Sequence, residues 1–218
     1  MILTLITVFV VCLCFRFPIA FSLGLSCLVY FFFKGTPLVV LPLKMYAGID
    51  VFVLLSIPGF IIAGNLMNQG GLTDKIINFC NYLLGHVRGG LSYVNITASM
   101  LFAGISGTAI SDTASLGAVM IPAMKKEGYE VDFSCAITAA SSTVGPIIPP
   151  SLPMIIAATL SGLSVGKLFL AGAIPGLLLG LGLMLVVYFV AKKKNYPKHE
   201  KSSLMQILKS FIDAFWAL

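Results

Sequence analysis

Charged residues are scarce in this sequence: only 10% of its 218 residues are Asp, Glu, Lys or Arg, whereas 58% are hydrophobic. Soluble domains carry roughly 25% charged residues. The mean hydropathy of +1.02 agrees with this, and several apolar stretches approach the ~20 residues that a helix needs to cross a bilayer. The composition therefore excludes a soluble domain and predicts an all-α, polytopic membrane protein in a lipid bilayer.

Catalytic residue types are also rare. The chain has two histidines, His86 and His199, and both lie in polar loops outside the apolar runs. Residues 104–107 read GISG, which is the GxSG pattern of rhomboid-type intramembrane serine proteases. That chemistry needs a histidine within hydrogen-bond reach of the serine as general base. Since neither histidine lies in an apolar span, an enzyme is not expected.

Other functional signatures are missing. The five cysteines show no metal-ligand spacing, and their odd number argues against a disulfide framework. No GxxxxGK[ST] sequence is present, so ATP is not expected to drive the chain directly. The net charge of +6 comes from basic residues in short loops between apolar runs. Such loops are topology signals, so the charge indicates no nucleic-acid partner, and no organic cofactor is expected.

The first 70 residues are expected to form scaffold spans. Apolar runs cover 1–15 and 17–33, hinged at Arg16 and Pro18, and could be two short spans or one re-entrant pair. A loop is expected next, marked by Pro37, Pro42, Gly48 and Asp50. A further span is expected over residues 51–68, ending at two glycines.

Two amphipathic segments are expected to lie in the membrane interface. Residues 71–88 place apolar side chains on one helical face and are too short and too polar to span. Residues 192–218 form a cytoplasmic or interfacial arm, in which Lys209 and Asp213 are spaced to pair at i,i+4. Between them, 166–191 reads as a transmembrane helix stopped by Lys192–Lys194, and the positive-inside rule places those lysines in the cytoplasm.

The stretch TAASSTVGPIIPPSLP, at residues 138–153, interrupts a strongly apolar region with four prolines. A continuous helix over 133–160 would be roughly 42 Å long, against a hydrocarbon thickness of ~30 Å. Proline lacks an N–H and clashes with the carbonyl four residues back. We therefore predict a broken helix over 131–161, non-helical at 144–150, with two half-helices of ~15 Å meeting near the midplane. A simple kink accommodated by packing is the alternative.

A break in a membrane helix leaves backbone groups free to bind ions. Non-helical backbone at membrane depth persists only inside protein or along a wet cavity. The C-terminal end of a half-helix suits a cation, and the N-terminal end suits an anion. The sequence therefore predicts a site for an ion and an anionic substrate. Its members in this segment are Ser141, Ser142, Thr143, Gly145, Pro146, Pro149, Pro150 and Ser151.

Residues 89–127 carry a second polar interruption, GISGTAISD. Two full spans or one re-entrant hairpin would satisfy the charge of the flanks equally, and a hairpin with its tip at 105–109 explains the small polar cluster better. The cluster adds Ser106, Gly107 and Thr108 to the predicted site. Asp112 is the only charge between Gly89 and Met124. An acid at membrane depth is a functional candidate, and it could equally cap the second hairpin helix.

Longer motifs carry a family resemblance. The runs LFAGISGTAISDTASLGAVMIPAMKKEGY, ITAASSTVGPIIPPSLPMII and GKLFLAGAIPGLLLGLGLMLVVYFVAKKKNYP, together with IPGFIIAGNLMNQGG and GHVRGGLSYVN, resemble the large membrane subunit of TRAP transporters, the DctM-like family. The resemblance covers the chain from about residue 48 onward.

The resemblance implies a fold of two inverted repeats that move as an elevator, each with a re-entrant hairpin and a broken helix. It implies a sodium-coupled secondary transporter in the bacterial inner membrane that takes up organic acid anions such as dicarboxylates or sialic acid. Its partners would be a small TRAP membrane subunit and an extracytoplasmic substrate-binding protein. Ser106, Thr108, Thr143 and Gly145 would hold the first sodium ion, largely through backbone oxygens.

This chain contains one hairpin and one broken helix, so the resemblance implies only the N-terminal half of a permease. A second-repeat half, or continued sequence, is then expected as a further partner. A passive channel or assembly module is the alternative function. Such a module would conduct without sodium coupling and without a binding protein.

Overall fold

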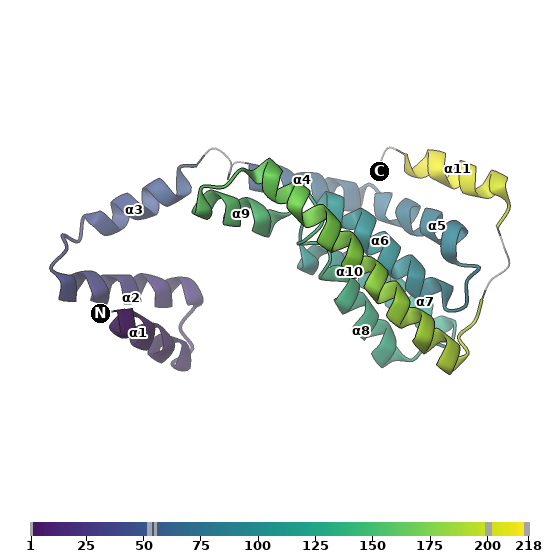
Figure 1. Cartoon of the computed structure of the whole chain (residues 1–218), viewed down its shortest axis with the longest axis horizontal. Helices are drawn as coiled ribbons and strands as arrows, with labels where there is room; N and C mark the ends of the chain where they lie inside the picture. Colours follow the sequence, from purple (N-terminus) through teal and green to yellow (C-terminus); the bar gives the residue numbers. More distant parts are fainter. Residues whose placement is uncertain (1, 52–53, 55, 199–201, 216–218) are drawn as a thin grey trace. The chain divides into compact units, whose positions relative to one another are not determined.

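The computed structural model describes residues 2–51, 54, 56–198 and 202–215, and every regular element within them is an α-helix. The predicted all-α class is therefore confirmed over the described residues, whereas the inverted repeat and the elevator motion stay predictions. The chain divides into two compact units, Met1–Phe52 and Val53–Leu218, whose relative placement is not determined. Figure 1 shows the helices of each unit.

The first unit is built on a helical hairpin. Helices α1 (Ile2–Cys14) and α2 (Ile19–Lys34) pack against each other. The chain reverses between them where Arg16 takes a φ of 61° and Pro18 precedes α2. At 1.5 Å per residue the two helices are roughly 20 and 24 Å long, so each is shorter than the hydrocarbon layer of a bilayer.

The loop predicted around residues 37–50 is wrong in its centre, because α3 (Val40–Ile49) is helical there. Pro42 is the third residue of α3, within the first turn, where the N–H of a residue has no intrahelical partner. Gly48 lies in the last turn and Asp50 caps the end. Proline and glycine therefore sit at positions where a helix tolerates them.

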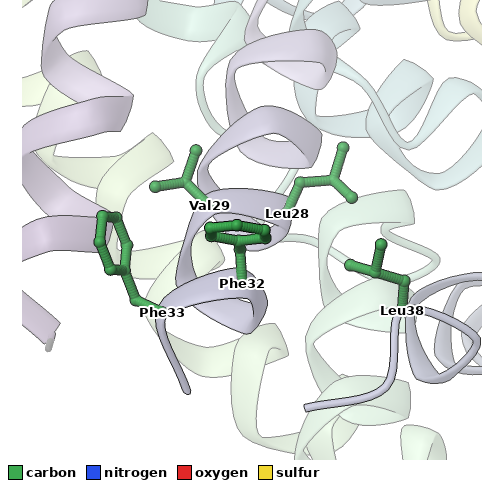
Figure 2. Close-up of a pocket in the computed structure, with 5 residues that line it drawn as sticks. All are labelled: Leu28, Val29, Phe32, Phe33 and Leu38. Atoms are coloured by element: carbon green, nitrogen blue, oxygen red, sulfur yellow. The ribbon is translucent and has the colours of Figure 1, made fainter. Parts of the chain in front are cut away.

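The surface of the first unit is apolar. Among its described residues only Cys12, Ser22 and Ser26 are buried. Figure 2 shows one consequence, an apolar groove of about 300 Å³ along the end of α2. It is lined by Leu28, Val29, Phe32, Phe33 and Leu38. This unit exposes its large hydrophobic side chains and buries small ones.

The second unit is a helical bundle arranged around α6. Helix α6 contacts α4, α5, α7, α8 and α10. Among the described residues its helices are α4 Ser56–Gln69, α5 Leu72–Leu84, α6 Gly90–Ser106, α7 Ala109–Lys126, α8 Val131–Ser142, α9 Leu152–Ser161, α10 Val165–Lys194 and α11 Leu204–Ala214. Its core is centred on α6, α7 and α8, with Phe102, Leu116 and Met120 almost completely buried.

Helix α10 is the one helix among the described residues that is both long and apolar enough to cross a membrane. Its 30 residues extend further than predicted, since Lys192–Lys194 form its last turn instead of ending it. Lysine is a good helix former, and its charge is favourable at a helix C-terminus. Asn195, with a φ of 52°, caps the end.

The end of α10 is fastened to two neighbouring loops. The amide of Gly89 donates to the carbonyl of Pro197 at 3.0 Å. The rings of Tyr129 and Tyr196 stack with centroids 4.3 Å apart, and Lys194 forms an ion pair with Glu130. These contacts join the segment after α10 to the turns that precede α6 and α8.

The amphipathic helices α5 and α11 pack against each other (Figure 1). Cys80 and Ile76 of α5 are fully buried. On α11 the buried residues among those described are Ser210 and Ala214. Leu208, by contrast, stays exposed. Small residues at 210 and 214 allow the two helices to approach closely.

Candidate functional site

The predicted interruption of the helix at residues 144–150 is confirmed. Helix α8 ends at Ser142 with Thr143 as its C-cap, and α9 begins at Leu152 after Ser151. The segment between them is a series of tight turns. The amide of Val144 donates to Ser141 at 3.0 Å, that of Gly145 to Ser142 at 3.1 Å, and that of Ile147 to Val144 at 2.9 Å.

Proline and serine set the conformation of this segment. Pro146, Pro149 and Pro150 have no N–H, so three amide donors that would otherwise need partners are absent. The peptide bond between Pro149 and Pro150 is cis. Ser151 joins the segment to the next helix, because its hydroxyl donates to the carbonyl of Pro146 and accepts from the amide of Met154 at 3.2 Å. It is therefore the N-cap of α9.

The turn between α6 and α7 is only two residues long. Gly107 caps α6 with a φ of 58°, and Thr108 caps α7 by accepting from the amide of Ser111 at 3.4 Å. Ser106, the last residue of α6, is buried. Its hydroxyl lies 3.4 Å from the carbonyl oxygen of Thr108. The GISGT sequence thus makes a compact reversal rich in backbone oxygens.

This turn lies directly against the interruption. The amide of Leu152 donates to the carbonyl of Gly107 at 3.3 Å. A Cβ added at Gly107 would lie 2.8 Å from the carbonyl oxygen of Pro150, and one at Gly145 would lie 3.6 Å from that of Thr108. Glycine is required at 107 both by the positive φ and by this close approach. The structure therefore brings together the two polar interruptions, which lie about forty residues apart in the sequence.

Four helix ends meet at this contact. Helices α6 and α8 present their C-terminal ends, and α7 and α9 present their N-terminal ends. The last carbonyls of a helix carry partial negative charge, and the first amides carry partial positive charge. The junction therefore offers oxygen ligands for a cation and amide donors for an anion within one small region.

Helix α10 covers another side of the interruption. Its Gly172, Gly176 and Gly180 recur every four residues and are buried. A Cβ at Gly172 would lie 2.6 Å from the carbonyl oxygen of Ile147, and at Gly176 it would meet the side chain of Ile148. The glycines thus let α10 lie against the non-helical backbone, which protein shields on this side.

A cavity of about 420 Å³ adjoins the turn. Ser106, Thr108 and Ser111 contribute hydroxyls to its lining, and Leu152 marks the start of α9. Asn65 of α4 also lines it and is not among the site residues predicted from the sequence. A cavity of this size is within the range that holds small organic ligands.

Asp112 lies in the first turn of α7 and is completely buried. Neither of its carboxylate oxygens makes a hydrogen bond among the described residues, and the same is true of the Ser142 hydroxyl. Ser142 and Ser99 are nevertheless its polar neighbours. The Thr108 side chain, not Asp112, accepts the capping hydrogen bond of α7. Burying an ionised carboxylate without partners is costly, and an acid at membrane depth is a functional candidate.

A polar seam between α6 and α8 was missed in the sequence. Asn95 donates to the hydroxyl of Thr138 at 2.7 Å, and Ser99 donates to that of Ser141 at 3.0 Å. All four residues are fully buried. Asn95 and Ser99 are spaced i,i+4 in an apolar helix, and so are Ser134 and Thr138. That periodicity of polar residues was the signal available in the sequence.

Most of the predicted site residues fall into two groups. Gly107, Thr108 and Gly145 meet with the prolines and Ser151 at the junction, whereas Asp112, Ser141 and Ser142 lie among the buried hydroxyls beside it. Thr143 differs from both groups, since it is exposed and its hydroxyl donates to the carbonyl of Ala140 at 2.7 Å. Its side chain is the least enclosed of the predicted ligands.

Comparison with known proteins assigns the sequence of this chain to a family. Residues 6–218 match the model of the DctM component of the tripartite ATP-independent periplasmic transporters. The chain is 44% identical over 202 residues to the sialic acid TRAP transporter permease SiaT of Haemophilus influenzae, covering 92% of this chain and 33% of that protein. It is 43% identical to the large permease SiaM of Vibrio cholerae, covering 92% of this chain and 47% of that protein.

A third relative is the C4-dicarboxylate TRAP transporter large permease DctM of Pseudomonas aeruginosa, 40% identical over 90% of this chain and 46% of that protein. The chain thus spans about a third to a half of the length of these relatives. Relatives of this kind are integral membrane permeases, and they are transporters rather than enzymes. The match covers nearly the whole chain, and on that evidence the chain belongs to the DctM family of TRAP transporter large permeases.

Proposed function

We propose that this chain is part of the permease of a sodium-coupled, binding-protein-dependent transporter for organic acid anions. The observation that carries the proposal is the junction of four helix ends, formed where the α6–α7 turn packs against the α8–α9 interruption. Helix ends of this kind hold a coupling ion and an anionic substrate in secondary transporters.

The sodium ion would be coordinated by oxygens around the junction. The candidate ligands are Ser106, Thr108, Thr143 and Gly145, largely through their backbone carbonyls. Support comes from the closeness of Thr108 and Gly145 and from the hydroxyl of Ser106 beside the carbonyl of Thr108. Asp112 would add negative charge nearby, which favours a cation over a neutral ligand.

The organic anion would bind at the cavity beside the turn. Its hydroxyl-bearing lining and the amides at the start of α7 and α9 suit a carboxylate. The relatives include permeases for sialic acid and for C4-dicarboxylates, and both of these substrates are carboxylates. The substrate class proposed here is therefore an organic acid anion.

The proposed assembly has several parts. A small TRAP membrane subunit and an extracytoplasmic substrate-binding protein would complete the tripartite system in a bacterial inner membrane. A second repeat, from continued sequence or another chain, would supply the other half of the substrate cavity. The α6–α7 pair would act as a re-entrant hairpin, and the unit containing it would move as an elevator.

Sodium binding is tested by hydrogen exchange on the full chain in nanodiscs. Sodium chloride should slow amide exchange around residues 104–112 and 143–152 relative to choline chloride at equal ionic strength. The Ser106→Ala variant should raise the half-maximal sodium concentration by about five-fold, the equivalent of roughly 1 kcal/mol. Thr113→Ala is the matched control, because its hydroxyl only donates to Ala109 within α7. Equal protection by choline would refute the site.

Transport is tested separately in proteoliposomes that contain the chain with the rest of its permease, the small subunit and the binding protein. Uptake of labelled sialic acid or C4-dicarboxylate should need an inward sodium gradient and should stop when the binding protein is left out. Flux that continues without either would support a passive channel instead.

A further inference from the structure

A second cavity lies between α5 and α11, away from the junction. It measures about 440 Å³, and all of its lining residues carry polar groups. Helix α5 contributes Lys75, Asn78 and Tyr82, and helix α11 contributes Ser210 and Asp213. Figure 1 shows these two helices side by side, in agreement with their contacts. Neither the family assignment nor the proposed transport site assigns a role to this cavity.

The cavity contains one positive and one negative group that do not pair with each other. Within the part of the chain that the structure describes, the ion pair is the one between Lys194 and Glu130. Lys75 and Asp213 therefore line the same cavity without a salt bridge. The pairing of Lys209 with Asp213 predicted from the sequence is not formed either, which leaves the Asp213 carboxylate available to a ligand.

The surroundings of the cavity are suited to lipid. Helices α5 and α11 are amphipathic, and such helices lie in the plane of a membrane interface. On α11, Met205, Leu208 and Ile212 recur at spacings of three and four and remain exposed, at 76%, 60% and 66%. Tyrosine, here Tyr82, is enriched at the level of the lipid headgroups. Helix α11 thus carries both lining residues of the polar cavity and an exposed apolar stripe.

We propose that this cavity binds the headgroup of phosphatidylethanolamine. Lys75 would pair with the phosphate as a compact cation, and Asp213 would accept charge-assisted hydrogen bonds from the ethanolamine ammonium. Asn78 and Tyr82 can donate to the phosphate oxygens. The acyl chains would lie along the exposed stripe of α11. This proposal needs only the membrane location of the family and does not depend on the transport site.

Charge complementarity selects this lipid over its neighbours. Phosphatidylglycerol has the phosphate but no cation for Asp213, whose carboxylate would remain unpaired. Phosphatidylcholine has a cation without N–H groups, so its trimethylammonium cannot donate hydrogen bonds to the carboxylate. A site with one lysine and one aspartate should therefore prefer the primary ammonium.

The test uses the purified full chain, delipidated in detergent, with dioleoyl forms of the three lipids. Added phosphatidylethanolamine should raise the midpoint temperature of thermal unfolding by several degrees more than the other two lipids. Native mass spectrometry should show the added phosphatidylethanolamine bound to the chain. Lys75→Gln and Asp213→Asn should each remove that preference. The controls are Asp74→Asn and Lys209→Gln, which change the same charges at positions next to the cavity but outside its lining.

Three results would overturn the proposal. The first is equal stabilisation by all three lipids, and the second is loss of the preference in the control variants. The third is a preference for phosphatidylglycerol that depends on Lys75 alone, which would indicate a simple phosphate site. Because Lys75 and Asp213 are exposed, their variants should fold, and the mass spectra report binding even if a melting temperature falls.

Discussion

The two compact units of this chain differ in the side chains that they bury. In the first unit, the buried residues among those described are a cysteine and two serines, while large apolar side chains such as Ile2 and Phe15 are each 75% exposed. The second unit buries an apolar core together with a set of fully enclosed polar groups around α6 and α8.

The difference lies in where the buried polar groups find their partners. In the first unit Ser26 donates to Ser22 at 2.6 Å and Ser22 to Pro18 at 3.2 Å, so both hydroxyls are satisfied by their own helix or the residue just before it. In the second, hydrogen bonds such as Asn95 to Thr138 join different helices. The first arrangement leaves the helices free to meet lipid or another chain, whereas the second fixes their positions.

The largest expected effect is a difference in thiol reactivity. Each unit offers one buried and one exposed cysteine, Cys12 and Cys14 in the first unit and Cys80 and Cys135 in the second. Burial raises the pKa of Cys80 to about 12. At pH 8 such a thiol is ionised in only about one molecule in ten thousand. Labelling by N-ethylmaleimide in detergent, followed by mass spectrometry, should therefore be at least about 100-fold slower at Cys80 than at Cys135.

The reactivity of Cys80 should appear only when the fold is lost or when the pH approaches 12, since a raised pKa keeps the thiol protonated below that value. Denaturant should restore rapid labelling at neutral pH. Rapid labelling of Cys80 in the native chain would show that α5 is not packed on α6 and α11.

A smaller effect is expected at the α6–α7 turn. Gly107→Ala forces a non-glycine residue into a φ of 58° and places its Cβ 2.8 Å from the carbonyl of Pro150. The variant should lose about 1–3 kcal/mol of unfolding free energy. Gly128→Ala is the matched control, because Gly128 has a φ of 85° but no atom within 4 Å of its Cβ position. Chemical unfolding in mixed micelles should rank Gly107→Ala as clearly the more destabilised.

If both glycine variants lost the same stability, the backbone conformation alone would matter, and the close packing of the turn on the interruption would be refuted. Uptake in the complete system should also fall more in the Gly107 variant.

The smallest expected effect is the difference in stability lost when each of the two kinds of buried hydrogen bond is removed. Asn95→Leu removes a bond between helices and should cost about 0.6–1.7 kcal/mol, the range measured for such bonds in membrane proteins. Ser26→Ala removes a bond within one helix, and the free energy of unfolding should change by less than about 0.5 kcal/mol. A double-mutant cycle with Thr138→Val isolates the pair energy. Equal costs at Asn95 and Ser26 would contradict the comparison between the units.

The interruption at 144–150 could be predicted because proline acts locally. Its missing N–H and fixed φ exclude a continuous helix whatever surrounds it. The same local logic failed at Pro42, where the position of a proline within the helix decides the outcome, and that position depends on where α3 begins. Lys192–Lys194 were predicted to end α10 but form its last turn. The reason is related, because a run of charged residues predicts where the membrane ends and not where the helix ends.

The site was predictable residue by residue, but its assembly was not. The small polar residues at 106–108 and 141–151 stand out in apolar sequence. That Gly107 touches Pro150, and that Gly145 lies beside Thr108, depends on how α6, α7 and α8 pack together. Asn95 and Ser99 were overlooked because single polar residues in an apolar helix are common, and only their partners on α8 show that they form a seam.

The glycines of α10 restrict how that helix can rotate against the interrupted segment. Turning α10 by one residue, about 100°, would replace Gly176 by Leu177 and Gly180 by Leu181 against Ile148 and Met100. A leucine has no room at Gly176, because even a single methyl there would collide with Ile148, whereas at Gly180 the flexible end of Met100 would have to move aside. Rotation of α10 about its axis is therefore coupled to movement of Ile148, which lies inside the interrupted segment.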